Sequence, residues 1–447
     1  MLLNLTLADI ASACNGQLVG TDKPVSSVVT DTRKIVEDCL FVALKGERFD
    51  GHDYVLQAVE EGAASVVSEK GLALSSYIKV EDTKVAYGCI ARLIRDAFQY
   101  PVICITGSNG KTTVKDWLSQ SFTDKNVLKT QANLNNQIGV PQTLLGLEKY
   151  HELAVVETGT SVPGEIARLA SIAHPDVVVL TNASGSHFEG FGDLAGIAQE
   201  KGNLISGAAT TATVILNADD GFYSYWCELA GDRKVVSFGF NDNADLYAYD
   251  LQLGANESQA TFRYQDEIIP VTVAGAGKHM IANGMSVALA MMAVGVSFTD
   301  AVAQLAIPVL VSGRLERLES KNGALLINDC YNASPKSVEA AIDVLAMQDV
   351  EETWLILGAL GELGALQDEV HRGLGIYAKS KDISHLICVG PVASIAGAAY
   401  DNEGGKALLC NTHEEAAELV ASLGKEHAIL VKGSRSAKME NVISALK

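Results

Sequence analysis

The middle of the chain alternates short β-branched runs with longer segments of helical periodicity, and this alternation constrains the fold more than any other feature. Strands that alternate with helices favour right-handed βαβ units and a mostly parallel sheet. An antiparallel insertion is predicted over residues 244–273, where polar and apolar residues alternate, and a buried helix over 279–294. The other predicted strands are residues 102–106, 153–157, 177–181, 213–217 and 234–238, with helices at 111–122, 163–173 and 193–206.

The same alternation returns in the last third, and the first hundred residues mix short strands with helices. Tyr100-Pro101 ends a predicted helix at 85–98, because proline disfavours helix in the residue before it. A chain of 447 residues is also expected to form more than one domain. We therefore predict three α/β domains: a small one over residues 1–98, a central P-loop-type one over 99–312, and a Rossmann-like one over 313–447. The further strands are 40–44, 324–328, 354–357, 386–389, 408–410 and 429–432, with helices at 367–380, 414–423 and 438–446.

The composition argues against two classes of partner. A net charge of −20 repels phosphate backbones, so no nucleic acid is expected. The longest apolar run, residues 285–296, is shorter than the roughly 20 residues that span a bilayer. The N-terminal segment has no basic leader and is a poor signal peptide. With scattered cysteines and no C-x-x-C pair, the expected location is the cytoplasm.

A glycine-rich turn, Thr-Gly-Ser-Asn-Gly-Lys-Thr-Thr at residues 106–113, follows the first strand of the central domain. Its glycines let the backbone wrap a phosphate, and the following helix directs N–H groups at the anion. Lys111 is placed to reach the β and γ phosphates, and the Thr112 hydroxyl to ligate Mg²⁺. The common G-x-x-x-x-G-K-[ST] pattern needs glycine where Ile105 stands, so this turn is a variant. The turn predicts a nucleoside triphosphate site, and a turn that binds nothing is the alternative.

Further candidate side chains are predicted near the same edge of the sheet. Glu157 ends one strand and His187 follows another, and the carboxyl ends of parallel strands open at one edge. Together they fit a Mg²⁺ site shared with phosphates, but a surface acid and a structural histidine are the alternatives. Lys201 lies on the helix that returns from this edge, where a solvated lysine is the alternative. Candidate contacts from the last domain follow a glycine or a strand, although each alone is equally a turn residue: Arg314, Asp329, Tyr331 and Asn332.

Together these motifs resemble the Mur ligase family over essentially the whole chain, and residues 106–113 are similar to that family's ATP signature. Residues 31–33 and 41–52 resemble its UDP-sugar-binding domain. Three departures stand out: Ser334 where the family usually has asparagine, Ala359 in place of aspartate, and an unusual segment at 183–186. The other matching stretches are residues 133–141, 157–159, 163–166, 329–335 and 431–435.

The resemblance implies an ATP-dependent ligase of peptidoglycan-precursor synthesis, with ATP and Mg²⁺ as cofactors and a monomer as the expected state. The implied reaction joins D-alanyl-D-alanine to UDP-N-acetylmuramoyl-tripeptide through an acyl-phosphate. Lysine and diaminopimelate both remain open as the third residue of the peptide.

The resemblance also assigns roles to positions that match the family's motifs. The catalytic residues it implies are Lys111, Glu157, His187 and Lys201. The metal ligands are Thr112, Glu157, His187 and, if it is carbamylated to a carboxylate-like group, Lys201. The nucleotide contacts are Gly107, Ser108, Asn109, Gly110, Lys111, Thr112, Thr113, Asn283, Arg314, Asp329, Tyr331 and Asn332. The muramyl-substrate contacts are Thr32, Arg33, Asn135 and Asn136.

Other activities remain open at this point. A Mur ligase that adds a single amino acid is the first alternative, although the D-N-P-R stretch that selects diaminopimelate is absent. A folylpolyglutamate-type synthase is the second, and it would not need the UDP-sugar-binding block. A nucleotide-gated scaffold or motor would hydrolyse ATP without an amine, and a catalytically dead binding module would lack the metal ligands.

Overall fold

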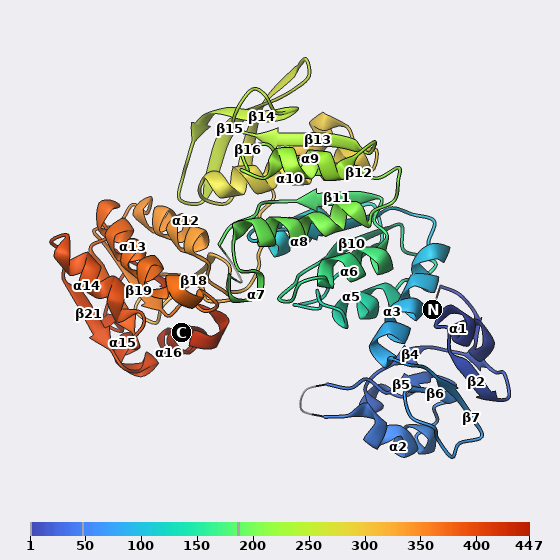
Figure 1. The fold of residues 1–447 in the computed structure, drawn as a ribbon. Coiled ribbons are helices and arrows are strands. Elements are labelled where there is room, and N and C mark those ends of the chain that lie inside the picture. Colours follow the sequence, from blue (N-terminus) through green and yellow to red (C-terminus); the bar gives the residue numbers. More distant parts are fainter. Residues whose placement is uncertain (1, 47–48, 186–187) are drawn as a thin grey trace.

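The computed structural model describes residues 2–46, 49–185 and 188–447. Within these residues the strands form three large sheets, one in each part of the chain, and one two-stranded pair. Figure 1 shows the sheets in chain order, from the N-terminal one (blue) through the central one (green) to the C-terminal one (red). We propose domain limits of 1–98, 99–312 and 313–447, because each range encloses one sheet with its helices.

The N-terminal sheet has five strands in the order β2-β7-β6-β5-β4, and only β2 runs antiparallel to its neighbour. The strand predicted at 40–44 is the shorter β5, and the predicted helix 85–98 is α3, which starts earlier because the Asp82 carboxylate caps it. The strands are β1 Leu5–Thr6, β2 Gln17–Gly20, β3 Pro24–Val25, β4 Val28–Val29, β5 Leu40–Val42, β6 Ser65–Ser68 and β7 Ser76–Lys79. The helices are α1 Leu7–Ala13, α2 Val55–Glu60 and α3 Thr83–Ala97.

Helix α3 attaches the N-terminal domain to the central one. Its buried residues, such as Ile90, belong to a single apolar cluster that includes α1 on one side and α6 (Glu165–Ala173) on the other. At its last turn the Arg95 guanidinium donates to Ala173 O and His174 O, both at 2.9 Å, and to Asp176 Oδ2 at 2.7 Å. Apolar packing and a buried charge therefore hold the two domains together.

The central sheet has nine strands in the order β16-β15-β14-β13-β12-β11-β8-β10-β9. All neighbouring strands from β14 across to β9 are parallel, and the pairs β14–β15 and β15–β16 are antiparallel. This agrees with the predicted alternation and antiparallel insertion. The strands are β8 Val102–Thr106, β9 Val127–Lys129, β10 Leu153–Glu157, β11 Val177–Leu180, β12 Thr213–Asn217, β13 Lys234–Gly239, β14 Leu246–Gln252, β15 Glu257–Tyr264 and β16 Glu267–Ala274. The other helices are α4 Lys111–Ser121, α5 Gly139–Leu145, α7 Phe188–Phe191, α8 Leu194–Ser206, α9 Tyr223–Ala230, α10 Lys278–Ala293 and α11 Phe298–Ala303.

Strand β8 is buried on both faces, and its alternating side chains enter two different cores. Val102 and Cys104 face the cluster of α3, α6 and α8, whereas Ile103 and Ile105 face the cluster of α4 and α10. β8 lies between β10 and β11, so the chain forms β9 and β10 on one side of β8 and then crosses to form β11 on the other side. A strand with this position marks the switch point of a doubly wound sheet, where ligands bind beyond its carboxyl end. The glycine-rich turn occupies that end.

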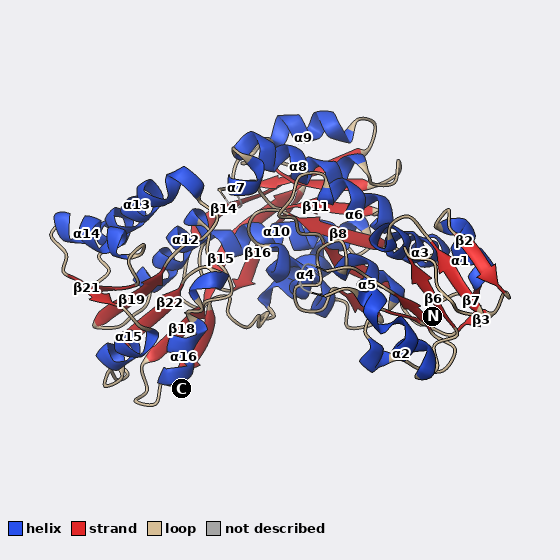
Figure 2. Ribbon diagram, turned by 60° about the horizontal axis from the view of Figure 1, so that its bottom comes forward, coloured by secondary structure: helices blue, strands red, loops and turns tan. Residues whose placement is uncertain are grey.

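The C-terminal sheet has six strands in the order β17-β18-β22-β19-β20-β21, all parallel except β17. Helices cover both of its faces (Figure 2), as expected for a Rossmann-like domain. Helix α12 was not predicted, and Asp329 is the last residue of β18, not the residue after it. The strands are β17 Glu316–Glu319, β18 Leu325–Asp329, β19 Glu352–Gly358, β20 His385–Val389, β21 Ala407–Cys410 and β22 His427–Lys432. The helices are α12 Pro335–Ala346, α13 Gln367–Ser380, α14 Ser394–Asn402, α15 His413–Val420 and α16 Glu440–Leu446.

Two features concern the chain as a whole. In the part of the chain that the structure covers, every helix is too short or too polar to cross a membrane. All eight cysteines are free thiols, and Cys39, Cys104, Cys330, Cys388 and Cys410 are buried. Small apolar thiols of this kind pack as part of the core.

Candidate functional site

The turn between β8 and α4 holds two glycines in backbone conformations that other residues rarely adopt. Gly107 has φ of 147° and Gly110 has φ of 85°. A Cβ at Gly107 would lie 1.9 Å from Thr181 Oγ1, and a Cβ at Gly110 would lie 2.5 Å from Asn283 Oδ1. Both separations are far below van der Waals contact, so only glycine fits. This close approach of the backbone is the geometry that a phosphate-binding turn needs.

Lys111 begins α4, and its ammonium group folds back over the turn. Nζ donates to Gly107 O at 2.7 Å and to Ser108 O at 3.3 Å. Burial lowers the pKa of Lys111, the Glu157 carboxylate opposes that shift, and the charge of Arg314 adds to it. The first N–H groups of α4 add the positive end of the helix at the same place. The turn therefore concentrates positive potential for an anion.

Thr112 and Glu157 meet at the carboxyl edge of the sheet. The Thr112 hydroxyl donates to Glu157 Oε2 at 2.9 Å, and Asn135 Nδ2 donates to Oε1 at 2.8 Å. Glu157 is only 2% exposed. A hydroxyl and a buried carboxylate side by side are oxygen ligands of the kind that Mg²⁺ prefers, so this pair fits such an ion.

Lys201 projects from α8 into the interior and is 4% exposed. Burial and, to a smaller extent, the charge of Lys111 lower its pKa to about 7, although Glu200 opposes the shift. An amine with this pKa is largely neutral above neutral pH and is available as a nucleophile.

His187 lies outside the described residues. Elsewhere in the described chain no three His, Cys, Asp or Glu side chains are grouped to hold a metal.

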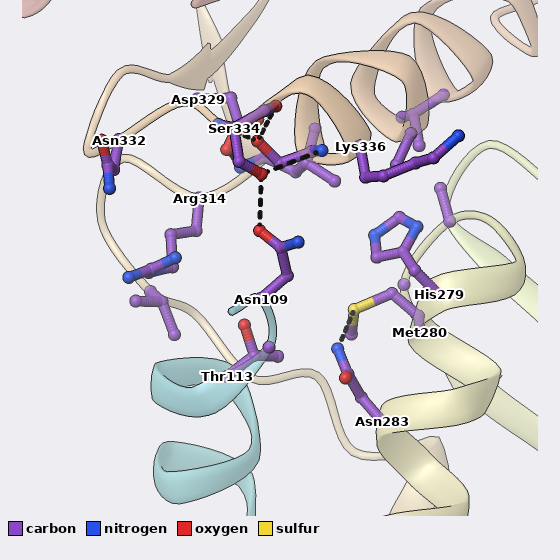
Figure 3. A pocket seen from close by; sticks show the side chains of 18 of the residues that line it. Asn109, Thr113, His279, Met280, Asn283, Arg314, Asp329, Asn332, Ser334 and Lys336 are labelled. Carbon is purple, nitrogen blue, oxygen red and sulfur yellow. Dashed lines mark hydrogen bonds between the residues drawn. The ribbon is translucent and has the colours of Figure 1, made fainter. Parts of the chain in front are cut away.

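A pocket of about 430 Å³ separates the phosphate-binding turn and α10 from the C-terminal domain (Figure 3). This volume lies in the range of small-molecule sites, which is roughly 300–1,000 Å³. Both domains line it with polar groups, including Asn109, His279, Asn283, Arg314, Asp329 and Asn332. The pocket thus brings together predicted residues that are more than two hundred positions apart in the sequence, such as Asn109 and Asn332.

The C-terminal domain contributes a fixed set of charges to this pocket. Arg314 Cζ lies 4.5 Å from the ring centroid of Tyr331, and its NH2 group donates to Thr112 Oγ1 at 3.0 Å. Asp329 forms an ion pair with Lys432, which is 1% exposed and also donates to Asn332 O at 3.1 Å. The Tyr331 ring holds Arg314 and the Asp329 carboxylate holds Lys432. These two side chains therefore lose little conformational entropy when a ligand binds.

The predicted substrate contacts separate into two groups. Asn135 donates to the Glu157 carboxylate, so it lies beside the pair that fits Mg²⁺. Asn136 Oδ1 instead accepts from the backbone of Ile138 and Gly139 at 3.1 and 3.0 Å. Thr32 and Arg33 lie in the N-terminal domain, outside the pocket, where the exposed Arg33 guanidinium holds the pKa of Asp31 at about 2.

Three residues of the site were not singled out from the sequence. Lys432 ends β22 directly beside Asp329 of the parallel strand β18, so the strand-end rule used for Glu157 could have found it. Asn182 follows β11, and its Oδ1 accepts from Asn109 N at 3.0 Å. His279 lines the pocket, and burial lowers its pKa. No local pattern distinguishes His279 from an ordinary helix histidine.

Comparison with known proteins gives consistent matches along the chain. Three family descriptions match: "Mur ligase family, catalytic domain" over residues 24–94, "Mur ligase middle domain" over 105–291 and "Mur ligase, glutamate ligase domain" over 313–435. The chain is 36% identical to UDP-N-acetylmuramoyl-tripeptide–D-alanyl-D-alanine ligase of Escherichia coli K12, covering 100% of this chain and 99% of that relative.

Two solved structures have the same architecture. MurF from Acinetobacter baumannii has a TM-score of 0.91 and 30% identity, covering 100% of this chain and 99% of that one. MurF from Thermotoga maritima, solved in complex with ADP, has a TM-score of 0.83 and 27% identity, covering 94% and 96%. The likeness extends over all three sheets.

Proposed function

This chain belongs to the Mur ligase family, and we propose that it joins D-alanyl-D-alanine to UDP-N-acetylmuramoyl-tripeptide in an ATP-dependent reaction. The full-length relatives that carry this activity in their names support the choice of substrates. The observation that carries the proposal is the phosphate-binding turn, with Lys111 and the Thr112–Glu157 pair, opening into a pocket between two domains. The Thermotoga maritima relative was solved in complex with ADP, which supports an adenine nucleotide as a ligand of this chain.

The proposed reaction has two stages. The terminal carboxylate of the tripeptide takes the γ-phosphoryl group of ATP, which gives an acyl-phosphate and ADP. The amine of D-alanyl-D-alanine then attacks the acyl carbon, the C–N bond forms, and inorganic phosphate leaves. Two anions must meet in the first stage, so the protein contributes mostly positioning and charge neutralisation.

The chain's own groups supply that neutralisation. Lys111 and the N-terminus of α4 lie on one side of the pocket, and Arg314 reaches over from the other. Thr112 and Glu157 would hold Mg²⁺, which would supply further positive charge to the phosphates. The reaction requires that the pocket, which two domains line, limit the access of water to the acyl-phosphate. We place this reaction in the cytoplasm, with which the free cysteines agree.

We also propose that Lys201 carries a carbamate. Its buried position beside Lys111 lowers the pKa to about 7, so a substantial share of the amine is neutral near pH 7, and a neutral amine adds CO₂ to give a carbamate and a proton. The resulting anion would pair with Lys111 and turn a repulsive contact into an attractive one. It would also offer oxygen ligands, which an ammonium group lacks.

Carbamylation of Lys201 should depend on pH in a defined direction. At constant CO₂ pressure, the ¹³C signal of a carbamate should grow as the pH rises through about 7, because the free amine replaces the ammonium form. NMR of the protein under ¹³CO₂ measures it, with Lys201→Arg as the control that should show no such signal. An identical spectrum for the two proteins would refute the carbamate.

Amine specificity is the direct test of the proposed function. With ATP, Mg²⁺ and UDP-N-acetylmuramoyl-tripeptide, phosphate release should require D-alanyl-D-alanine and should be at background with diaminopimelate, lysine or glutamate. Mass spectrometry should find the pentapeptide product, which distinguishes ligation from uncoupled hydrolysis. Phosphate release that ignores the amine would indicate an ATPase, and a preference for a single amino acid would indicate another ligase of the family.

A further inference from the structure

We propose that Ser334 is a positioning residue that holds the C-terminal domain on the phosphate-binding turn through Asn109. The proposal rests on the proposed function, since it takes this turn as the ATP site. Its central observation is a hydrogen bond across the domain boundary: Ser334 Oγ donates to Asn109 Oδ1 at 2.8 Å. Figure 3 shows this bond at the pocket, between the turn below and the start of α12 above.

Asn109 has every polar group committed. Its amide Nδ2 donates to Ser184 Oγ at 2.7 Å, and its backbone N–H donates to Asn182 Oδ1 at 3.0 Å. Its carbonyl oxygen accepts from Thr181 Oγ1 at 2.6 Å. Asn182 Nδ2 also donates to this carbonyl oxygen at 3.2 Å. Within the described chain, four hydrogen bonds to residues 181–184 therefore fix Asn109, and a fifth, from Ser334, comes from the C-terminal domain. A change in that bond changes the anchorage of the turn itself.

Ser334 is equally constrained on its own side. It is the N-cap of α12, where its hydroxyl accepts from Ser337 N at 3.3 Å, and Pro335 follows as the first helical residue. Its backbone N–H donates to Ser337 Oγ at 2.9 Å, which completes a capping box. The Ser334 hydroxyl oxygen accepts the bond of the cap, and its single hydrogen remains free to be donated to Asn109. The residue is 7% exposed, so water does not compete freely for that hydrogen.

The C-terminal domain forms hydrogen bonds at two points, one to the turn and one to the start of α4. Ser334 holds Asn109, and Arg314 NH2 donates to the Thr112 hydroxyl at 3.0 Å. These two contacts flank Lys111, the residue that bends back over the turn. Movement of the domain away from the pocket must break both contacts, so domain docking and the shape of the turn are coupled. A nucleotide that binds while the domain is docked meets donors that are already in place.

Three variants separate positioning from simple helix capping. Ser334→Ala removes both the cap and the bond to Asn109, whereas Ser334→Thr keeps a hydroxyl for both. Thr412→Ala is the matched control: Thr412 caps α15 in the same domain through Glu415 N, and it is not a pocket residue. Loss of either cap should lower the melting temperature to a similar extent, because an N-cap residue contributes about 1 kcal/mol.

The readouts are the Kd for ADP with Mg²⁺ by calorimetry, and hydrogen exchange of the backbone amides of residues 107–113. Ser334→Ala should weaken ADP about twofold to tenfold, the loss of one hydrogen bond, and should speed exchange in the turn. Ser334→Thr and Thr412→Ala should match the wild type in both. In an Asn109→Ala background, Ser334→Ala should add no further loss of affinity.

The outcomes discriminate between the two proposals. Unchanged ADP affinity and unchanged exchange in Ser334→Ala would overturn the role of Ser334 while leaving the nucleotide site intact. Equal losses of ADP affinity in Ser334→Ala and Thr412→Ala would overturn the role of Ser334 as well, since a general loss of stability would then explain both. A wild-type protein that does not bind ADP would instead overturn the proposed function.

Discussion

Replacing Lys111 with alanine should lower kcat by about three orders of magnitude or more without disturbing the fold. The expectation follows from where the ammonium group lies: it is held over the turn by Gly107 O and Ser108 O and is the cation placed at the first helical residue. Charge that develops on the transferred phosphoryl group has to be balanced there, at the pocket between the two domains. Little structural loss is expected, because the hydrogen bonds of the side chain are to the turn itself.

Phosphate release under saturating ATP, tripeptide and D-alanyl-D-alanine measures the effect, with circular dichroism to check the fold. Lys129→Ala is a suitable control, since Lys129 lies on β9, is partly exposed, pairs with Asp116 at 2.8 Å and does not line the pocket. That variant should turn over at the wild-type rate. Near-normal turnover of Lys111→Ala would remove the turn from the catalytic machinery.

Five strands of the central sheet, β8 and β10 to β13, could be predicted from the sequence to within one residue, for a physical reason, whereas β9 was not predicted and β14 to β16 were predicted only as one antiparallel insertion. β8, β10 and β12 are continuous apolar runs closed by a polar residue, and sheet strands covered by helices on both sides take that form. The N-terminal sheet was harder, because strands such as β3 and β4 have two residues each and leave no periodicity to detect. Helix α12 was missed although its start is marked in the sequence by a capping serine, Ser334, followed by Pro335 at the first helical position.

The site could be predicted only where the sheet alone determines it. Thr112 lies just after the turn that follows β8, Glu157 ends the neighbouring parallel strand β10, and their side chains do meet at 2.9 Å. The pairing of Arg314 with Thr112 depends on how the C-terminal domain docks, and no pattern in the chain encodes that angle. Likewise, a helix lysine such as Lys201 shows its burial only once the neighbouring helices are in place.

Glu157→Gln should lower kcat by about two to three orders of magnitude and raise the Mg²⁺ concentration needed for half-maximal rate. The substitution keeps the volume of the side chain but removes a charge that is buried beside Lys111. It also replaces one carboxylate oxygen, which now accepts from Thr112 Oγ1 or from Asn135 Nδ2, by an amide that donates. A neutral amide is a much weaker ligand for a hard divalent cation than a carboxylate. Its loss also lowers the pKa of Lys111 further, because the Glu157 carboxylate is what raises it.

A Mg²⁺ titration of the initial rate, repeated for Asp176→Asn, isolates this role. Asp176 also joins strands of the central sheet, accepting from Val102 N at 2.8 Å and Arg95 NH2 at 2.7 Å, but at the opposite edge, where the strands begin. Loss of its charge should therefore lower the melting temperature and leave the Mg²⁺ requirement unchanged. Glu157→Gln should show the reverse pattern, with a small thermal shift and a large metal effect. Equal Mg²⁺ requirements for Glu157→Gln and the wild type would mean that the carboxylate serves only to fix Thr112 and Asn135, and the metal would have to be held by other groups.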